Sequence, residues 1–157
     1  MKAYDLNAIN EVDGIAAITY RDAAFFRGET AVPVVDIPYG VKPEEFTPNY
    51  EIKAKPTLYH IGSMNWMPNE EGILWFIKNV WEKLSAREPD IVLNLAGRHT
   101  PKWLMNLKKK NINVLGEVPD AKEFIKDNDI AIVPLLSGSG IRIKIIEAMA
   151  MGKTVIT

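Results

Sequence analysis

The strongest chemical signal in the sequence is a glycine-rich turn with charged residues directly behind it. The turn contains Gly138, Ser139 and Gly140, and it leads from a predicted strand into a predicted helix. The free backbone N–H groups and the dipole at the start of a helix favour an anion there, typically a phosphate. Arg142 projects from the first turn of this helix and adds a cation near the loop. A glycine-rich turn without a ligand is the simpler alternative.

The same helix carries two further charged residues. Gly140, Lys144 and Glu147 fall on one face of it, at spacings of four and three residues. Charges among apolar residues are costly unless they are paired or bind a ligand. A local Lys144–Glu147 ion pair, worth about a few tenths of a kcal/mol, leaves Arg142 unexplained. We therefore favour phosphate binding by Arg142 and Lys144, with Glu147 accepting hydrogen bonds from hydroxyl groups.

The elements that must position these residues alternate regularly after Pro56. Short apolar strands alternating with helices are typical of an α/β fold with a doubly wound, Rossmann-like parallel sheet. We expect strands at residues 57–62, 91–97, 112–115, 130–134 and 153–157. We expect one helix capped by Asn69 and others at residues 101–110, 120–127 and 141–151, the last of them buried on most sides.

The chain before the regular part, residues 1–56, does not show this alternation of strands and helices. Residues 1–37 contain a single β-α-β unit, and residues 38–56 form a proline-rich segment, which we interpret as an ordered linker because proline fixes φ repeatedly. The last predicted strand has no helix after it to cover the sheet, which suggests a piece of a longer protein.

Ligands of an open α/β sheet bind at the carboxyl ends of the strands. Gly62 and Ser63 follow the first strand of the regular part, and Arg98 follows the second. Amides at Gly62 and Ser63 and the charge of Arg98 would suit a nucleotide, although a turn glycine and a solvated arginine explain them equally well. His60 lies inside a strand and is expected to be a core or edge histidine with satisfied hydrogen bonds rather than a catalytic base.

Composition excludes several classes of protein. The chain has 157 residues with 19 basic and 20 acidic side chains, so its net charge of −1 gives no overall field for nucleic acid or an anionic membrane. It has no cysteine, which fits a reducing compartment. No carboxylate or histidine cluster has metal-ligand spacing. Without a signal peptide or an apolar run of about 20 residues, we expect a cytoplasmic protein.

Four segments, in the expected order, resemble retaining glycosyltransferases of the GT-B fold, the group that includes glycosyltransferase family four. They match the linker, the first loop of the C-terminal domain, the base-contacting loop and the donor site, and they lie at residues 37–48, 60–69, 114–120 and 137–157. The resemblance implies a remnant of an N-terminal acceptor domain at 1–37, a linker at 38–56 and an incomplete nucleotide-sugar domain at 57–157.

The implied activity is transfer of a sugar, with retention, from a nucleotide-diphosphate sugar to a hydroxyl of a carbohydrate or lipid-linked acceptor. The resemblance implies no cofactor and no metal, and a role in polysaccharide or glycolipid synthesis. It leaves peripheral membrane association of the full-length protein open, and it implies that this piece alone binds nucleotide weakly and does not turn over.

The resemblance also assigns roles to residues. Arg142 and Lys144 would neutralise the diphosphate leaving group, Glu147 would hold the ribose hydroxyls, and Glu117 and Val118 would lie beside the nucleobase.

The glutamate-x7-glutamate motif of the group places its first glutamate at position 139, where this chain has Ser139. A variant of the motif with a small residue there, followed by Arg-x-Lys, fits this chain. Two other classes remain open. One is a sugar-nucleotide epimerase of the same fold; the other is a non-catalytic nucleotide-sugar-binding or scaffold domain, which Ser139 favours.

Overall fold

The computed structural model describes residues 7–51, 53–138 and 140–157. The chain divides into two compact units, the second of which comprises residues 41–138 and 144–157. In the first unit, β1 (Ile15–Ala17) pairs in parallel with β2 (Val34–Asp36), and α2 (Tyr20–Glu29) connects them. The hydroxyl of Thr19 caps α2 by accepting a hydrogen bond from the Asp22 N–H. This is the β-α-β unit that the sequence predicts.

The second unit contains a five-stranded parallel sheet in the order β5-β4-β3-β6-β7. The chain adds β4 and β5 on one side of β3 and then returns to add β6 and β7 on the other. The strand order therefore reverses between β3 and β6, which is the doubly wound α/β topology that the sequence predicts. The strands are β3 (Thr57–Ile61), β4 (Val92–Ala96), β5 (Ile112–Gly116), β6 (Ile130–Ile132) and β7 (Thr154–Ile156).

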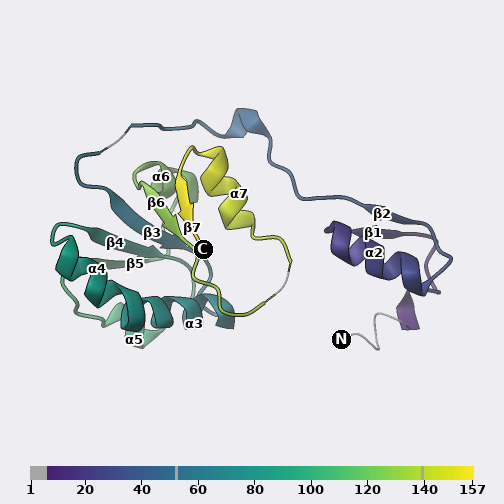
Figure 1. Ribbon diagram of the computed structural model, residues 1–157, viewed down its shortest axis with the longest axis horizontal. Coiled ribbons are helices and arrows are strands. Elements are labelled where there is room, and N and C mark those ends of the chain that lie inside the picture. Colours follow the sequence, from purple (N-terminus) through teal and green to yellow (C-terminus); the bar gives the residue numbers. More distant parts are fainter. Residues whose placement is uncertain (1–6, 52, 139) are drawn as a thin grey trace. The chain divides into compact units, whose positions relative to one another are not determined.

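Helices cover both faces of this sheet, with α3, α4 and α5 on one face and α6 and α7 on the other (Figure 1). Alternate strand residues supply the two cores: Leu58 packs toward α3, while its neighbour Tyr59 packs toward α6 and α7. The helical segments are η1 (Pro43–Glu45), α3 (Met67–Phe76), η2 (Ile77–Trp81), α4 (Glu82–Arg87), α5 (Lys102–Met105), α6 (Ala121–Lys126) and α7 (Ile143–Ala150).

The start of α3 differs from the sequence-based expectation. Asn69 has the residue type of an N-cap, but the helix begins at Met67 with Trp66 at the cap position. Pro68 explains the earlier start, because its fixed φ suits the first turn of a helix and it needs no N–H partner there. Asn69 is thereby carried into the first turn, where only 4% of it is exposed.

Two other helices are shorter or more exposed than predicted. The helix expected from Pro101 to Lys110 ends at Met105, because the chain turns there and brings Leu107 against the core. The helix expected to begin at Ile141 and to be buried on most sides begins at Ile143. Met149, at 65% exposed, shows that one face of it is open in the second unit.

The linker segment packs against the second unit. Phe46 lies against the core between the sheet and α7, and Asn49 donates its N–H to the carbonyl of Met151 at 3.2 Å. Lys53 donates to the carbonyl of Asp127 at 2.7 Å. These contacts hold this proline-rich segment, whose residues from Val41 on belong to the second unit, against the sheet and α6.

Candidate functional site

A pocket of about 340 Å³ opens at the carboxyl ends of β3, β4 and β5. Three separate loops line it, one after each strand, and the residues include five that the sequence analysis proposed as substrate-binding. These are Gly62, Ser63, Arg98, Glu117 and Val118. The structure therefore brings these five residues together at the edge of the sheet where open α/β folds bind ligands.

The floor of this pocket is glycine backbone. Gly62 donates its N–H to the carbonyl of Ala96 at 3.1 Å, just beyond the ends of β3 and β4. Gly97 donates its N–H to the carbonyl of Gly116 at 2.7 Å. The loops approach so closely that a Cβ at position 97 would overlap the carbonyl oxygen of Gly62. Glycine at position 97 is what allows the loops after β3 and β4 to meet.

Lys144 extends from α7 toward Gly62, a residue that lines this pocket, but Lys144 is not itself among the lining residues. Its ammonium donates a hydrogen bond to Oδ1 of Asn69 at 2.6 Å. A Cβ at Gly62 would come within 2.7 Å of the Lys144 Nζ, so the ammonium lies directly against the glycine that lines the pocket.

His60 lies near Lys144 and is 1% exposed. Its Nδ1 is 2.9 Å from the carbonyl oxygen of Ile132, which can only accept, so the neutral ring donates from Nδ1. Burial, together with the nearby Lys144 charge, lowers the pKa of His60 to about 3. His60 is therefore a core histidine, but only its Nδ1 has a hydrogen-bond partner, while Nε2 is buried without one among the described residues.

This buried ring predicts a specific pH dependence of stability. Unfolded histidine takes up a proton near pH 6.5, whereas folded His60 stays neutral down to about pH 3. Below about pH 6.5 the unfolded state therefore binds more protons, and stability falls by up to ~1.4 kcal/mol per pH unit. Denaturant unfolding at a series of pH values measures this slope, and His60→Asn should remove this contribution.

His99 supplies the matched control. It is exposed and has a φ of 56°, which asparagine adopts readily. His99→Asn should therefore keep the wild-type slope. Burial raises the pKa of Glu147, so protonation of this carboxylate favours the folded state as the pH falls. This contribution is the same in both variants and cancels when their slopes are compared. An unchanged slope in His60→Asn would contradict the neutral buried ring.

Glu147 lies one turn beyond Lys144 on α7 and is half-buried. Desolvation raises the pKa of its carboxyl group, and the positive charge of Lys122 partly opposes this. The carboxylate also acts on the buried hydroxyl of Tyr59, because burial and the charge of Glu147 both raise the pKa of that tyrosine. Glu147 is not among the residues that line the 340 Å³ pocket.

The glycine-rich turn before α7 has the backbone that glycine permits. Gly138 and Gly140 have φ values of 98° and 89°, in the region that other residues avoid. Ser139 lies outside the described residues. Arg142 is half-buried and immediately precedes α7, and with Gly140 it is assigned to the first compact unit. Gly138 belongs to the second unit and is not among the residues that line the pocket.

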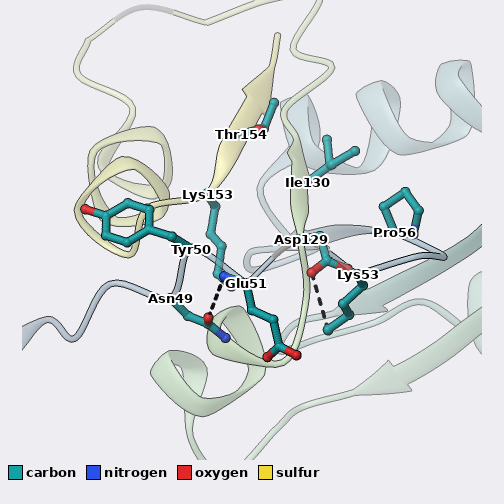
Figure 2. A pocket seen from close by; sticks show the side chains of 10 residues that line it. Asn49, Tyr50, Glu51, Lys53, Pro56, Asp129, Ile130, Lys153 and Thr154 are labelled. Carbon is teal, nitrogen blue, oxygen red and sulfur yellow. Dashed lines mark hydrogen bonds and ion pairs between the residues drawn. The ribbon is translucent and has the colours of Figure 1, made fainter.

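A second pocket, of about 470 Å³, lies at the opposite end of the sheet, where the linker passes the start of β7 (Figure 2). Lys53 pairs there with Asp129 at 3.4 Å. Lys153 is buried and donates to the carbonyl of Lys126 at 2.9 Å. These cations hold the linker and the turn before β6 in place. Open α/β sheets bind ligands at the carboxyl ends of their strands. We therefore take the 340 Å³ pocket at those ends as the candidate site.

In the described part of the chain, no group of three or more His, Asp or Glu side chains is placed to hold a metal ion. No helix among the described residues is both long enough and apolar enough to cross a membrane.

The family described as "Glycosyl transferases group 1" matches residues 55–157, well over half of the chain. The chain belongs to this family. No curated protein matches it in sequence.

Solved structures share the fold of this group 1 glycosyltransferase chain. A TarM structure from S. aureus, in complex with UDP, fondaparinux and alpha-GlcNAc-glycerol, has a TM-score of 0.75 and 17% identity. The pneumococcal O-GlcNAc transferase GtfA, in complex with UDP and GlcNAc, has a TM-score of 0.72 and 15% identity. The alignments cover 98% and 97% of this chain but 31% of each structure's chain. The chain thus spans about a third of the length of these structures.

One residue of this site was missed by sequence reasoning. Asn69 bonds Lys144 and also donates from Nδ2 to the carbonyl of Ser63 at 2.8 Å. Its residue type suggested a helix cap and hid this role. The available signal is its place at the end of residues 60–69, a segment that resembles a glycosyltransferase loop.

Proposed function

We propose that this chain is the donor-binding part of a glycosyltransferase. The enzyme would break the bond between the anomeric carbon of a sugar and a nucleoside diphosphate, and form a new bond to an acceptor hydroxyl with retention. One observation carries the proposal: the Lys144 ammonium lies beside Gly62, which lines a pocket built by three strand-end loops. Membership of the group 1 glycosyltransferases supports it.

The pocket suits a diphosphate on physical grounds. The negative charge on the departing diphosphate increases as the sugar bond breaks. A cation already in place stabilises that charge without rearranging at the moment of reaction. Lys144 would be such a cation, and Arg142, two residues before it in the sequence, would add a second. The backbone N–H of Ser63, together with the exposed Arg98, would complete the phosphate contacts.

The remaining roles concern the nucleoside and the acceptor. Glu117 and Val118 lie at the β5 end of the pocket and would contact the nucleobase. Glu147 would accept hydrogen bonds from the ribose hydroxyls. Because the TarM and GtfA structures contain UDP, a uridine donor is the first to test. A carbohydrate or lipid-linked acceptor, in cytoplasmic polysaccharide or glycolipid synthesis without a cofactor or metal ion, completes the proposal.

A calorimetric titration of the chain with UDP, GDP and ADP tests this function. We expect one nucleotide to bind in preference to the other two, because the side chains proposed to contact the base, Glu117 and Val118, would not fit uracil, guanine and adenine equally. We also expect no sugar transfer by this chain alone, since it covers 31% of the length of the TarM chain. Absence of binding by all three diphosphates would overturn the donor-site assignment, and measurable transfer would overturn the expected inactivity.

A further inference from the structure

We propose that Asn69 is a positioning residue of the donor site, which holds the Lys144 ammonium in place for the diphosphate. The inference rests on the proposed function of Lys144 and adds a residue to it. Asn69 acts through Lys144 and would not itself contact the substrate.

One side-chain amide joins the two parts of the site. Its Oδ1 accepts from the Lys144 Nζ at 2.6 Å, and its Nδ2 donates to the Ser63 carbonyl at 2.8 Å. Lys144 comes from α7, and Ser63 belongs to the loop after β3 that lines the pocket. Since Asn69 is only 4% exposed, water competes little for either hydrogen bond. The amide therefore fixes the distance between the cation and the pocket loop.

Asn69 is itself held rigidly. Its backbone N–H donates to the carbonyl of Trp66 at 2.9 Å, in the first turn of α3. Three residues later, α3 packs so tightly that a Cβ at Gly72 would overlap the carbonyl of Pro134. A side chain on such a fixed helix can place its partner within the narrow tolerance that a binding site needs.

The chemistry of an amide suits this role better than a carboxylate would. Asn69 accepts the hydrogen bond but contributes no formal charge, so it orients the ammonium without cancelling its charge. The glycine beneath both groups allows this arrangement: a Cβ at Gly62 would lie 2.7 Å from the Lys144 Nζ and 2.9 Å from the Asn69 Nδ2. Gly62 thus leaves the space in which the cation and the amide meet.

A double-mutant cycle tests the inference. UDP and uridine are titrated into the wild-type chain, Asn69→Ala, Lys144→Ala and the double variant. We expect Asn69→Ala to weaken UDP binding about tenfold, the effect of losing a hydrogen bond to a charged group. Uridine binding should change less than about twofold. In the Lys144→Ala background, Asn69→Ala should have almost no further effect, because contacting residues that act together are not additive.

Two further variants separate positioning from general damage. Asn69→Asp should weaken UDP binding more than Asn69→Ala, because its carboxylate would pair with Lys144 and repel the diphosphate. Asn128 is the matched control: it is 3% exposed, donates to the Phe124 carbonyl at 2.7 Å and accepts from Asn94 at 2.7 Å. Asn128→Ala should lower the unfolding temperature while leaving UDP affinity within about twofold of wild type.

Each result has a clear consequence. If Lys144→Ala weakens UDP binding and Asn69→Ala does not, the positioning role is wrong and the donor site stands. The role is also wrong if Asn69→Ala weakens binding equally in the wild-type and Lys144→Ala backgrounds, because the amide then acts on the loop alone. If the wild-type chain binds no UDP, GDP or ADP, the donor site and the positioning role are both wrong.

Discussion

Lys144→Ala weakens the binding of UDP to this chain by about 10- to 100-fold, since hydrogen bonds to charged groups contribute ~1.5–3 kcal/mol. The substitution removes the ammonium that lies against Gly62 at the wall of the pocket. Isothermal titration of UDP into both chains measures the change. The loss should also be smaller at high salt, because salt screens the attraction of a partly exposed cation for a dianion.

Two control variants identify the cause of that loss. Lys144→Met keeps an apolar stem of similar length, so it should weaken UDP as much as Lys144→Ala if the charge is what matters. Lys78 is exposed on η2 and gives the same change in net charge away from the pocket. Lys78→Ala should leave UDP affinity within about twofold. If Lys144→Ala and the wild-type chain bind UDP with equal affinity, the Lys144 ammonium does not bind the diphosphate and the proposed function loses its main support.

The sequence predicts the fold well because its main signal is local. Each strand of the second unit is a short apolar run, and all five lie where those runs lie. Strands that alternate with helices form a parallel sheet with helices on both of its faces. The turn that carries Gly138 is likewise visible, since only glycine fits its φ of 98°.

What the sequence could not predict depends on contacts between distant segments. Lys144 and Asn69 are 75 residues apart, and they meet because the strand order reverses between β3 and β6. The burial of a helix residue also depends on which elements pack against each face of that helix, and the sequence does not show this. Met149 follows the apolar pattern of its helix, yet it is 65% exposed because the core contacts only the face that carries Ala148.

The candidate site also contains residues that the local sequence predicts and residues that only contacts between distant segments explain. Gly62 and Arg98 could be named from their places at strand ends, because the carboxyl ends of parallel strands share one edge of a sheet. Asn69 could not, since its role depends on Pro68 starting the helix early and turning the amide inward. Residue type alone assigned it to a cap.

We expect Gly97→Ala to lower both the free energy of unfolding and the affinity for UDP. A Cβ at this position would overlap the Gly62 carbonyl, so the loops after β3 and β4 must separate. Overpacking of this kind costs about 1–3 kcal/mol of unfolding free energy. Moving Gly62 also shifts the surface against which Lys144 lies, and we expect UDP affinity to fall at least tenfold, equivalent to about 1.4 kcal/mol. Chemical denaturation and calorimetry measure the two effects.

Gly28→Ala is the matched control for that substitution. Gly28 lies in α2, and a Cβ there would meet nothing within 4 Å. Alanine in a helix should leave stability unchanged or raise it by about 0.5–1 kcal/mol. If Gly97→Ala behaves like Gly28→Ala, the loops after β3 and β4 do not meet through glycine, and the floor of the pocket must be built differently. If it loses stability but keeps UDP affinity, the close approach serves the sheet alone, and the diphosphate binds away from Gly62.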